Sequence, residues 1–288
     1  MMNSKHILRW FSITSVWLWL ILFALVPALL VILTSFLHYD ANELVRWQLT
    51  WHNYQRLFDA QYLLVFWRSF LLASVCTGLC LIIAYPFAYF LARLHQGKYL
   101  LLLLIMIPFW TSSLIRTYAI VAILKAKGVL NTLLIYSGLI EKPLSILYST
   151  PAVLIGLVYS LLPFMILPLY ASIEKLDRRL IDAARDLGAN RIRIFWHVML
   201  PLTLPGIMGG LLLVLLPAMS LFYIPDILGG ARSLLIGNAI ADQFLSAHNW
   251  PVGSAVSMLL SALMILMLLL YFKINKTQTL LQSDDLNL

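Results

Sequence analysis

The sequence predicts an all-α, polytopic membrane protein. Of its 288 residues, 62% are hydrophobic and 11% are charged, whereas soluble domains are about 45–50% apolar and about 25% charged. Apolar runs long enough to cross a bilayer recur along the chain, and such runs are typical of transmembrane helices. The alternating pattern of membrane β-barrel strands does not recur, so we expect helices.

The apolar runs define six expected transmembrane segments, because a helix needs about 20 residues to cross a bilayer. The first follows Lys5 and Arg9. It is too long for a signal peptide and lacks a convincing cleavage site, so we interpret it as a retained span. The six segments are 12–37, 66–92, 99–123, 151–171, 201–221 and 251–272.

Prolines in the third, fourth and fifth segments bear on whether these helices are continuous. Pro108 interrupts the third, Pro163 and Pro168 interrupt the fourth, and Pro217 lies late in the fifth. Transmembrane helices tolerate proline where neighbouring groups satisfy the carbonyls that lose a hydrogen bond. We therefore keep all three segments as spans.

The distribution of Lys and Arg predicts the orientation. Twelve of them lie in 1–11, 93–98, 172–200 and 273–288, and six, Arg232 among them, lie in 38–65, 124–150 and 222–250. Cytoplasmic loops carry the excess of positive charge, which places both termini in the cytoplasm. The net charge of +8 is thus explained by topology, and no nucleic-acid partner is expected.

These segments divide the chain into three regions. Residues 1–65 hold the first span and an external loop, and 66–272 form a five-span core with a cytoplasmic loop near 172–200. Residues 273–288 form a cytoplasmic tail.

The loop after the fourth span is highly charged. In EKLDRRLIDAARDLGANRIR, residues 174–193, ten of twenty residues are charged. Its apolar residues recur at helical spacing and share one face. Gly188 follows them where a helix end favours a left-handed residue. The residues of this face are Leu176, Leu180, Ala183, Ala184 and Leu187.

A second short helix is expected after Asn190, a plausible N-cap. Ile192, Phe195, Trp196 and Met199 share its apolar face, and Pro201 marks entry into the fifth span. A loop that merely sets topology needs no paired apolar faces, so the pattern favours a docking element.

Residues 182–201 resemble the cytoplasmic signature of permeases in binding-protein-dependent ABC importers. That signature is E-A-A, three residues, G, nine residues, I, one residue, L-P. Asp182 and Val198 replace Glu and Ile, and every spacing fits. The resemblance implies a type I importer permease of MetI-like fold, whose loop docks in a groove of an ATPase. The implied coupling residues are Asp182, Ala183, Ala184, Gly188, Leu200 and Pro201.

Four further segments, 108–120, 127–134, 158–177 and 216–238, look like those of spermidine/putrescine permeases. This implies a subunit of a polyamine importer in a bacterial inner membrane, surrounded by lipid. The implied partners are a second homologous permease, an ATPase dimer and an external polyamine-binding protein. A permease for another small substrate is the alternative.

The sequence lacks the motifs of bond chemistry. It has no GxxxxGK[ST], so ATP and Mg would be bound by the partner ATPase, and no cofactor or metal motif indicates an enzyme. An intramembrane enzyme would need a catalytic pair, which is missing. A proton-coupled carrier, the other class considered, would place carboxylates at membrane depth, and none lies well within a span.

A polyamine is a polycation, so its path must offer aromatic faces or carboxylates. The candidates are the aromatic residues Trp110, Tyr159, Phe222 and Tyr223, with Asp226 as the nearest acid, toward the outer mouth. The alternative is that these rings are packing and interface residues.

Arg116 is a cation within the third segment. Either it extends to the outer interface along the helix, or it contacts the binding protein or a carboxylate such as Asp226.

Overall fold

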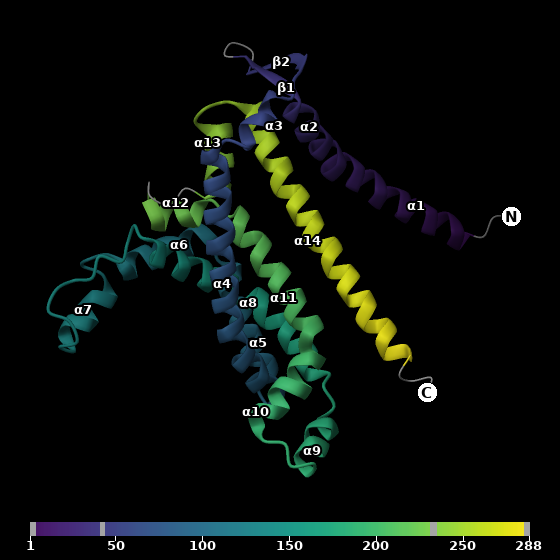
Figure 1. Ribbon diagram of the computed structural model, residues 1–288, viewed down its shortest axis with the longest axis vertical. Helices are drawn as coiled ribbons and strands as arrows, with labels where there is room; N and C mark the ends of the chain where they lie inside the picture. Colours follow the sequence, from purple (N-terminus) through teal and green to yellow (C-terminus); the bar gives the residue numbers. More distant parts are fainter. Residues whose placement is uncertain (1–3, 41–43, 231–234, 285–288) are drawn as a thin grey trace. The chain divides into compact units, whose positions relative to one another are not determined.

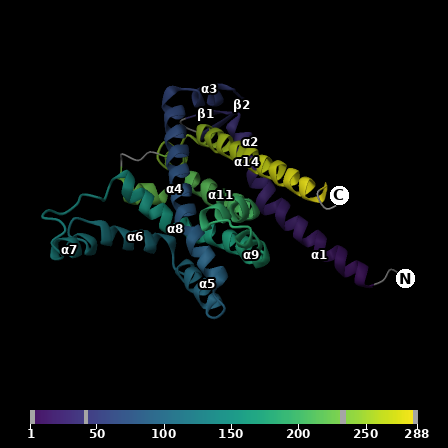
Figure 2. The same cartoon turned by 60° about the horizontal axis from the view of Figure 1, so that its bottom comes forward.

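The computed structural model describes residues 4–40, 44–230 and 235–284, and of 4–9, 11 and 274–284 it describes the backbone alone. Within these described residues the regular elements are helices apart from two short strands, in agreement with the predicted class (Figure 1, and from a second direction Figure 2). Its elements are α1 Ser4–Leu20, η1 Ile21–Leu25, α2 Val26–Ser35, β1 Leu37–Asp40, β2 Leu44–Leu49, α3 His52–Leu57, α4 Ala60–Arg93, α5 Lys98–Met106, η2 Ile107–Trp110, α6 Ser113–Leu124, α7 Val129–Tyr136, α8 Thr150–Glu174, α9 Arg178–Asp186, α10 Arg191–Ile194, η3 Phe195–Met199, α11 Leu200–Ser220, α12 Tyr223–Gly229, α13 Ile236–Leu245 and α14 Trp250–Asp284.

Six described segments are long and apolar enough to cross a membrane, which confirms the predicted number. The first, second, fourth and sixth agree with the predicted ranges to within a few residues. The fifth begins about ten residues earlier than predicted, at Arg191. The six are Ser12–Ser35, Ala60–Arg93, Ser113–Tyr136, Thr150–Glu174, Arg191–Ser220 and Trp250–Lys273.

The predicted third span, 99–123, is wrong as a continuous helix. The chain forms a shorter apolar helix over 98–110, and the segment long enough to cross begins at Ser113. Pro108 cannot donate a backbone hydrogen bond, and the helix tightens into the 3-10 turn η2. Thr111 and Ser112 then have extended ψ angles of 151° and 134°, which separate η2 from α6.

The fourth span is not interrupted, contrary to the expectation from its prolines. Helix α8 is continuous through Pro163 and Pro168. Its apolar residues, including Leu161, Met165 and Leu169, are buried among neighbouring helices. Tertiary packing of this kind holds a helix together across positions that lack an N–H donor.

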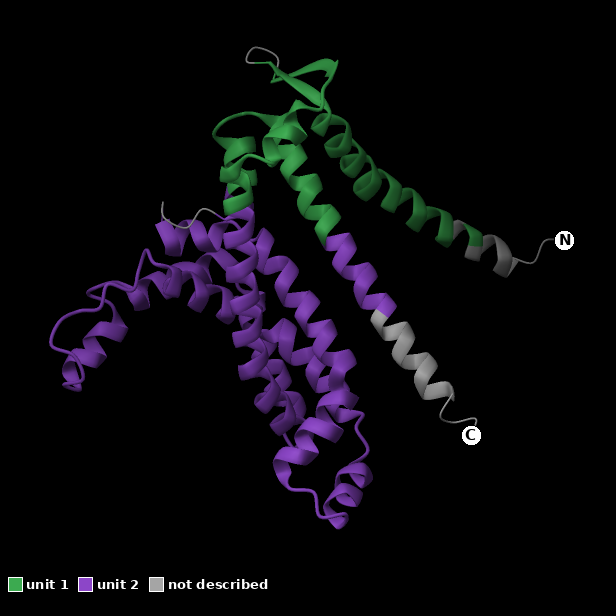
Figure 3. Cartoon of the chain, in the orientation of Figure 1, with its two compact units in different colours: residues 1–64, 239–263 green, residues 65–238, 264–288 purple. Residues whose placement is uncertain are grey.

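The chain divides into two compact units, 1–64 with 239–263 and 65–238 with 264–288 (Figure 3). In the first unit, β1 and β2 pair antiparallel, an element that the sequence analysis did not predict. The Asn53 amide donates to the carbonyls of Ser35 and Leu37, at 3.0 and 2.8 Å, and so ties α3 to the start of β1. Thr34 and Ser254 share a 2.7 Å hydroxyl contact between α2 and α14.

The first span presents its apolar side chains outward. None of the residues in its apolar window is buried within the chain, and Trp17, Leu22 and Phe23 are all exposed. So large an exposed apolar surface needs lipid or another protein to cover it. Arg232, counted among the external residues, and residues 231–234 of the segment 216–238 lie outside the described residues.

Helices α8 and α11 form the central pair of the second unit and lie side by side in both views (Figures 1 and 2). Gly206 and Gly210, both buried in α11, lie four residues apart and therefore on one face. A Cβ atom on Gly206 would lie 2.4 Å from the Cβ of Ser172 and 2.7 Å from the carbonyl oxygen of Pro168. The two backbones approach this closely because glycine lacks a side chain.

Helix α12 packs against α8 and α6. Gly156 of α8 makes room for it, since a Cβ there would lie 2.3 Å from Leu228 Cδ1. Buried Asn131 fixes the segment after α7: its amide nitrogen donates to the Lys125 and Leu144 carbonyls, and its oxygen accepts from Leu144 N at 2.8 Å. These contacts hold the elements around the central pair.

Candidate functional site

The charged loop begins with a capped helix. Asp177 precedes α9, and its carboxylate accepts a hydrogen bond from the backbone N–H of Arg179 at 3.0 Å. A carboxylate at this position satisfies a free N–H and interacts favourably with the positive end of the helix dipole. The start of α9 is thus encoded locally.

A glycine turn ends α9, as predicted. Gly188 has φ of +79°, a conformation that residues with a Cβ adopt only at an energetic cost. Its N–H donates to the Arg185 carbonyl at 2.8 Å, and the N–H of Ala189 donates to the Ala184 carbonyl at 3.0 Å. This pair of bonds is the Schellman motif of a helix C-terminus, and it turns the chain sharply between α9 and α10.

Asn190 caps the next helix, which confirms its predicted role: its side-chain oxygen accepts from Arg193 N at 2.8 Å. The expected boundary at Pro201 is wrong, because α10 continues through the π turn η3 directly into α11. Leu200 N–H donates to the Phe195 carbonyl, five residues back. The wider turn lies just before Pro201, which has no N–H to continue the regular pattern.

The structure buries a different face of the loop helices from the apolar face that the sequence analysis predicted. Ile181 packs inward and is buried, whereas Leu180 is 48% exposed and Leu187 is 88% exposed. Beyond the turn, Met199 is buried but Ile192 and Trp196 are exposed. The predicted apolar face therefore points largely outward. We call its exposed residues the coupling surface: Leu180, Ala183, Leu187, Ile192 and Trp196.

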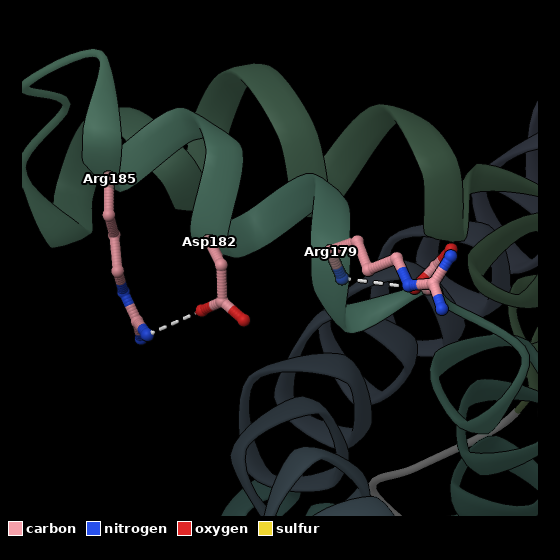
Figure 4. Close-up of polar contacts among 4 residues, drawn as sticks. Arg179, Asp182 and Arg185 are labelled. Atoms are coloured by element: carbon pink, nitrogen blue, oxygen red, sulfur yellow. Dashed lines mark hydrogen bonds and ion pairs between the residues drawn. The ribbon is translucent and has the colours of Figure 1, made fainter.

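Asp182 lies on the side of α9 that carries Arg185 and is not one of the coupling-surface residues. Its carboxylate pairs with the Arg185 guanidinium one turn along, at 3.0 Å, and both side chains point toward one another (Figure 4). Both are more than half exposed. A pair so exposed contributes about 0–1 kcal/mol to stability. Asp182 is therefore free to exchange Arg185 for another partner at little energetic cost.

Contacts beneath the coupling surface connect it to a span. The Phe195 ring packs edge-on against the Tyr85 ring of α4, with centroids 5.3 Å apart. The Tyr85 hydroxyl makes a 3.1 Å hydrogen bond with the Thr203 hydroxyl of α11. These contacts connect the loop to α4, and the continuous helix connects it to α11.

The candidate path residues lie on three elements. Trp110 ends η2 and is 82% exposed, and Tyr159 lies on α8 and is 45% exposed. Phe222 and Tyr223 meet edge-on at the break between α11 and α12, with centroids 6.2 Å apart, and Asp226 is exposed in the first turn of α12. Within the described chain, no cavity or contact brings all five together. Their exposure shows that Trp110 in particular is not a packing residue of this chain.

Arg116 lies in the first turn of α6, and its guanidinium carbon is 4.6 Å from the centre of the Phe109 ring. It lines an apolar cavity of about 220 Å³, together with Tyr159 and Pro163. Its Nε is buried, and no described residue accepts a hydrogen bond from it. The suggested ion pair with Asp226 is not among the two found in the described part of the chain.

The sequence analysis missed three positions that the structure makes important. Gly206 and Gly210 form a G-x-x-x-G pattern, which signals close helix packing in membranes. Ile181 was not distinguished from the apolar residues around it, because α9 has apolar residues on two faces. The glycine pattern was readable from sequence, and the burial of Ile181 was not.

Continuous apolar helices joined by an amphipathic, solvent-exposed loop define a transport permease rather than an enzyme. Residues 5–277 match the family described as "Binding-protein-dependent transport system inner membrane component". The chain belongs to this family and is a multi-pass inner-membrane protein. Such a permease works with a second permease, an ATPase and a substrate-binding protein.

Among its relatives is the spermidine/putrescine transport system permease protein PotB of Haemophilus influenzae, 51% identical over 92% of this chain and 93% of the relative. The protein of that name in Escherichia coli is 50% identical over 90% of this chain and 94% of the relative. The narrower resemblance seen in the sequence, to permeases of this type, is confirmed.

The fold is also that of a solved transporter. A chain of a bacterial alginate ABC transporter, in complex with a pentasaccharide-bound periplasmic protein, superposes with a TM-score of 0.75. The match covers 93% of each chain at 15% sequence identity. Likeness at this identity shows the importer permease fold and carries no information about substrate.

Proposed function

We propose that the chain is the PotB-like permease subunit of an ATP-driven importer of spermidine and putrescine. The observation that carries this proposal is sequence similarity. Two permeases named for spermidine/putrescine transport are about 50% identical to this chain over about nine-tenths of its length. The exposed coupling surface supports the mechanism. It presents apolar side chains on one face of α9, as a helix that inserts into a partner's groove requires.

The chain transmits movement and does no bond chemistry. Closure of the ATPases moves α9, and this movement passes through Phe195 and Tyr85 to α4 and through η3 to α11. The spans then alternate between inward-facing and outward-facing arrangements. In this mechanism Asp182, Ala183 and Ala184 contact the ATPase, Gly188 sets the angle of the loop, and Leu200 and Pro201 begin the moving span.

The partners follow from this assignment. A PotC-like permease completes the pathway, a PotA-like ATPase dimer binds ATP and Mg, and a PotD-like protein delivers polyamine from outside. Both termini then lie in the cytoplasm; the even number of spans and the excess of Lys and Arg on one side support this orientation. Under the same assignment, the first span and its external loop lie in 1–65, the five-span core in 66–272 and the cytoplasmic tail in 273–288.

Reconstitution tests the function directly. The chain, co-purified with these three partner types in proteoliposomes, is expected to take up labelled spermidine only when ATP and the binding protein are present. Uptake by the chain alone, without ATP, would show a secondary carrier instead. ATP-dependent uptake of a different solute, with no polyamine uptake, would retain the importer and reject the substrate.

Charge reversal at Asp182 is expected to release the ATPase. Losing one partner of a partly buried charged contact at an interface costs about 2–5 kcal/mol, so Asp182→Lys should strongly reduce co-purification of the ATPase, while Asp182→Glu should retain it. Arg185→Gln is the control, because it breaks the ion pair within α9 and leaves the carboxylate. If Arg185→Gln releases the ATPase as Asp182→Lys does, the contact is structural and not intersubunit.

Substituting a candidate path residue by a smaller or neutral one is expected to slow polyamine uptake without affecting assembly with the partner subunits. One cation–π contact is worth about 0.5–2 kcal/mol, so Trp110→Ala should slow spermidine uptake about 2- to 30-fold, and Asp226→Asn should act in the same direction. Trp47→Ala is the control, since Trp47 is also highly exposed but lies on β2. Submicromolar spermidine affinity of the permease pair by calorimetry would contradict a weakly binding path.

A further inference from the structure

Two adjoining cavities lie against α9, one beside the ends of α4, α5 and α8 and the other beside α4, α10 and η3. Their volumes are about 310 and 500 Å³, and both are lined by Tyr89, Arg93, Ile181 and Met199. Arg93 is the last residue of α4, Lys98 is the first of α5 and Glu174 is the last of α8. The cavities are therefore at the level where these helices leave the apolar region.

The lining is rich in positive charge. Glu174 is the one acidic residue that lines the cavities, and its carboxylate forms a salt bridge with the Lys98 ammonium at 2.5 Å. The Arg93 guanidinium lies 4.4 Å from the centre of the Tyr89 ring, a contact that leaves its charge uncompensated. Arg178 lines one cavity and Arg191 the other. Arg185 also lines the second cavity, but its guanidinium is paired with Asp182. The other three guanidinium groups remain to interact with an anion.

Arg178 occupies an electrostatically unfavourable place in its helix. It is the first residue of α9, where the helix dipole is positive and a cation is destabilising. The Asp177 carboxylate, which caps the same end of α9, offsets part of this repulsion, and a bound anion beside Arg178 would offset more.

An apolar helix adjoins the cavities. Helix α5 begins at Lys98 and exposes Tyr99, Leu100, Leu103 and Leu104. Lys98 also lies over the Tyr99 ring, 5.0 Å from its centre. Tyrosine and lysine together are typical of the membrane interface. Acyl chains packed along the exposed leucines would bring their headgroup to the basic lining.

The cavity face of α9 is separate from the coupling surface. At about 100° per residue, Arg178, Ile181 and Arg185 lie on one side of the helix. Leu180, Ala183 and Leu187 lie on the opposite side, where they are exposed. An anion in the cavities and a protein partner on the coupling surface can therefore bind α9 at once.

We propose that these cavities bind the phosphate of an anionic phospholipid, held by Arg93, Arg178 and Arg191. Basic pockets between transmembrane helices on the cytoplasmic side suit such headgroups. The proposal rests on the cytoplasmic placement of α9 under the proposed function. The bound lipid would hold α9 against the ends of α4 and α8 while its other face engages the ATPase.

Paired charge removals test the site in the purified full-length chain. Arg178→Gln with Arg191→Gln removes two cavity residues. Arg179→Gln with Arg193→Gln removes the same charge from the same two helices, at positions that do not line the cavities. Native mass spectrometry then measures retention of phosphatidylglycerol against phosphatidylcholine. At roughly fivefold in affinity per guanidinium, the cavity pair should lose about 30-fold in phosphatidylglycerol affinity and the control pair little.

Several results would overturn the proposal. One is an equal loss of phosphatidylglycerol affinity in the cavity pair and the control pair of variants. The others are retention of phosphatidylcholine as strong as that of phosphatidylglycerol, and displacement of the lipid by the ATPase subunit. Displacement by low millimolar inorganic phosphate would identify a free anion as the ligand and reject the lipid. Arg93→Gln serves as a second variant if the cavity pair unfolds. Because binding is read out without transport, failure of polyamine uptake with lipid binding intact would reject the proposed function alone.

Discussion

Replacing Gly206 by alanine is expected to destabilise the second unit more than any other single added methyl group considered. The new Cβ would lie 2.4 Å from the Cβ of Ser172 and 2.7 Å from the backbone carbonyl oxygen of Pro168. Neither atom can rotate away, since one is fixed to the backbone and the other belongs to it. Helices α8 and α11 must therefore move apart along their whole contact.

Overpacking a tightly packed core costs about 1–3 kcal/mol, and we expect Gly206→Ala to lie at or above the upper end. Two neighbouring glycines give a graded comparison. At Gly210 the nearest atom is the flexible Met165 sulfur, 2.5 Å from the added Cβ, and at Gly209 it is the Cβ of Pro168 at 3.7 Å, an ordinary contact. The thermal unfolding midpoint in detergent should fall most for Gly206→Ala, less for Gly210→Ala and least for Gly209→Ala.

The order of these three effects is the informative result. If alanine were unfavourable at every glycine position of α11, all three unfolding midpoints would fall equally. If Gly209→Ala is as harmful as Gly206→Ala, the close approach of α8 and α11 does not control the stability of this unit. Substituting Ser172 by glycine together with Gly206→Ala removes one of the two clashing atoms, and it should restore part of the lost stability.

The features that sequence predicted well depend on few neighbours. The number of spans was predictable because hydrophobicity is averaged over about 20 residues. The left-handed Gly188 and the Asn190 cap were predictable because their hydrogen bonds join residues close in sequence. Such features are decided by the chain next to them, so a single sequence is enough.

The features that sequence could not predict depend on tertiary packing. Leu180 and Ile181 are adjacent apolar residues, yet one is exposed and the other is buried, because α10 and η3 pack against one side of α9. Pro163 and Pro168 suggested a break that packing around α8 prevents. At Pro108 the break shifted the third span by many residues. Nothing in the sequence joins Trp110, Tyr159 and Asp226 in space, and their shared role remains a proposal.

Replacing Gly188 by valine is expected to uncouple ATP hydrolysis from transport. Its φ of +79° costs a residue with a Cβ about 1–2 kcal/mol, and a β-branched side chain is the least tolerant. No atom lies within 4 Å of the position of a Cβ there, so the effect comes from the backbone and not from a clash. To relieve the strain, the chain must give up the hydrogen bonds of Gly188 and Ala189 to the end of α9.

Loss of those bonds changes the angle between α9 and α10, and with it the arrangement of Leu187 and Ile192 on the coupling surface. We expect Gly188→Val to be inserted in the membrane at normal levels but to lose most substrate-stimulated ATP hydrolysis and spermidine uptake. Gly188→Asn should retain much of both, because asparagine tolerates the left-handed conformation. Gly138→Val is the matched control: Gly138 has φ of +71° and equally open surroundings, but it lies after α7, away from the loop. An equal defect in Gly138→Val, or normal uptake by Gly188→Val, would show that the geometry of this turn does not transmit the force of the ATPase.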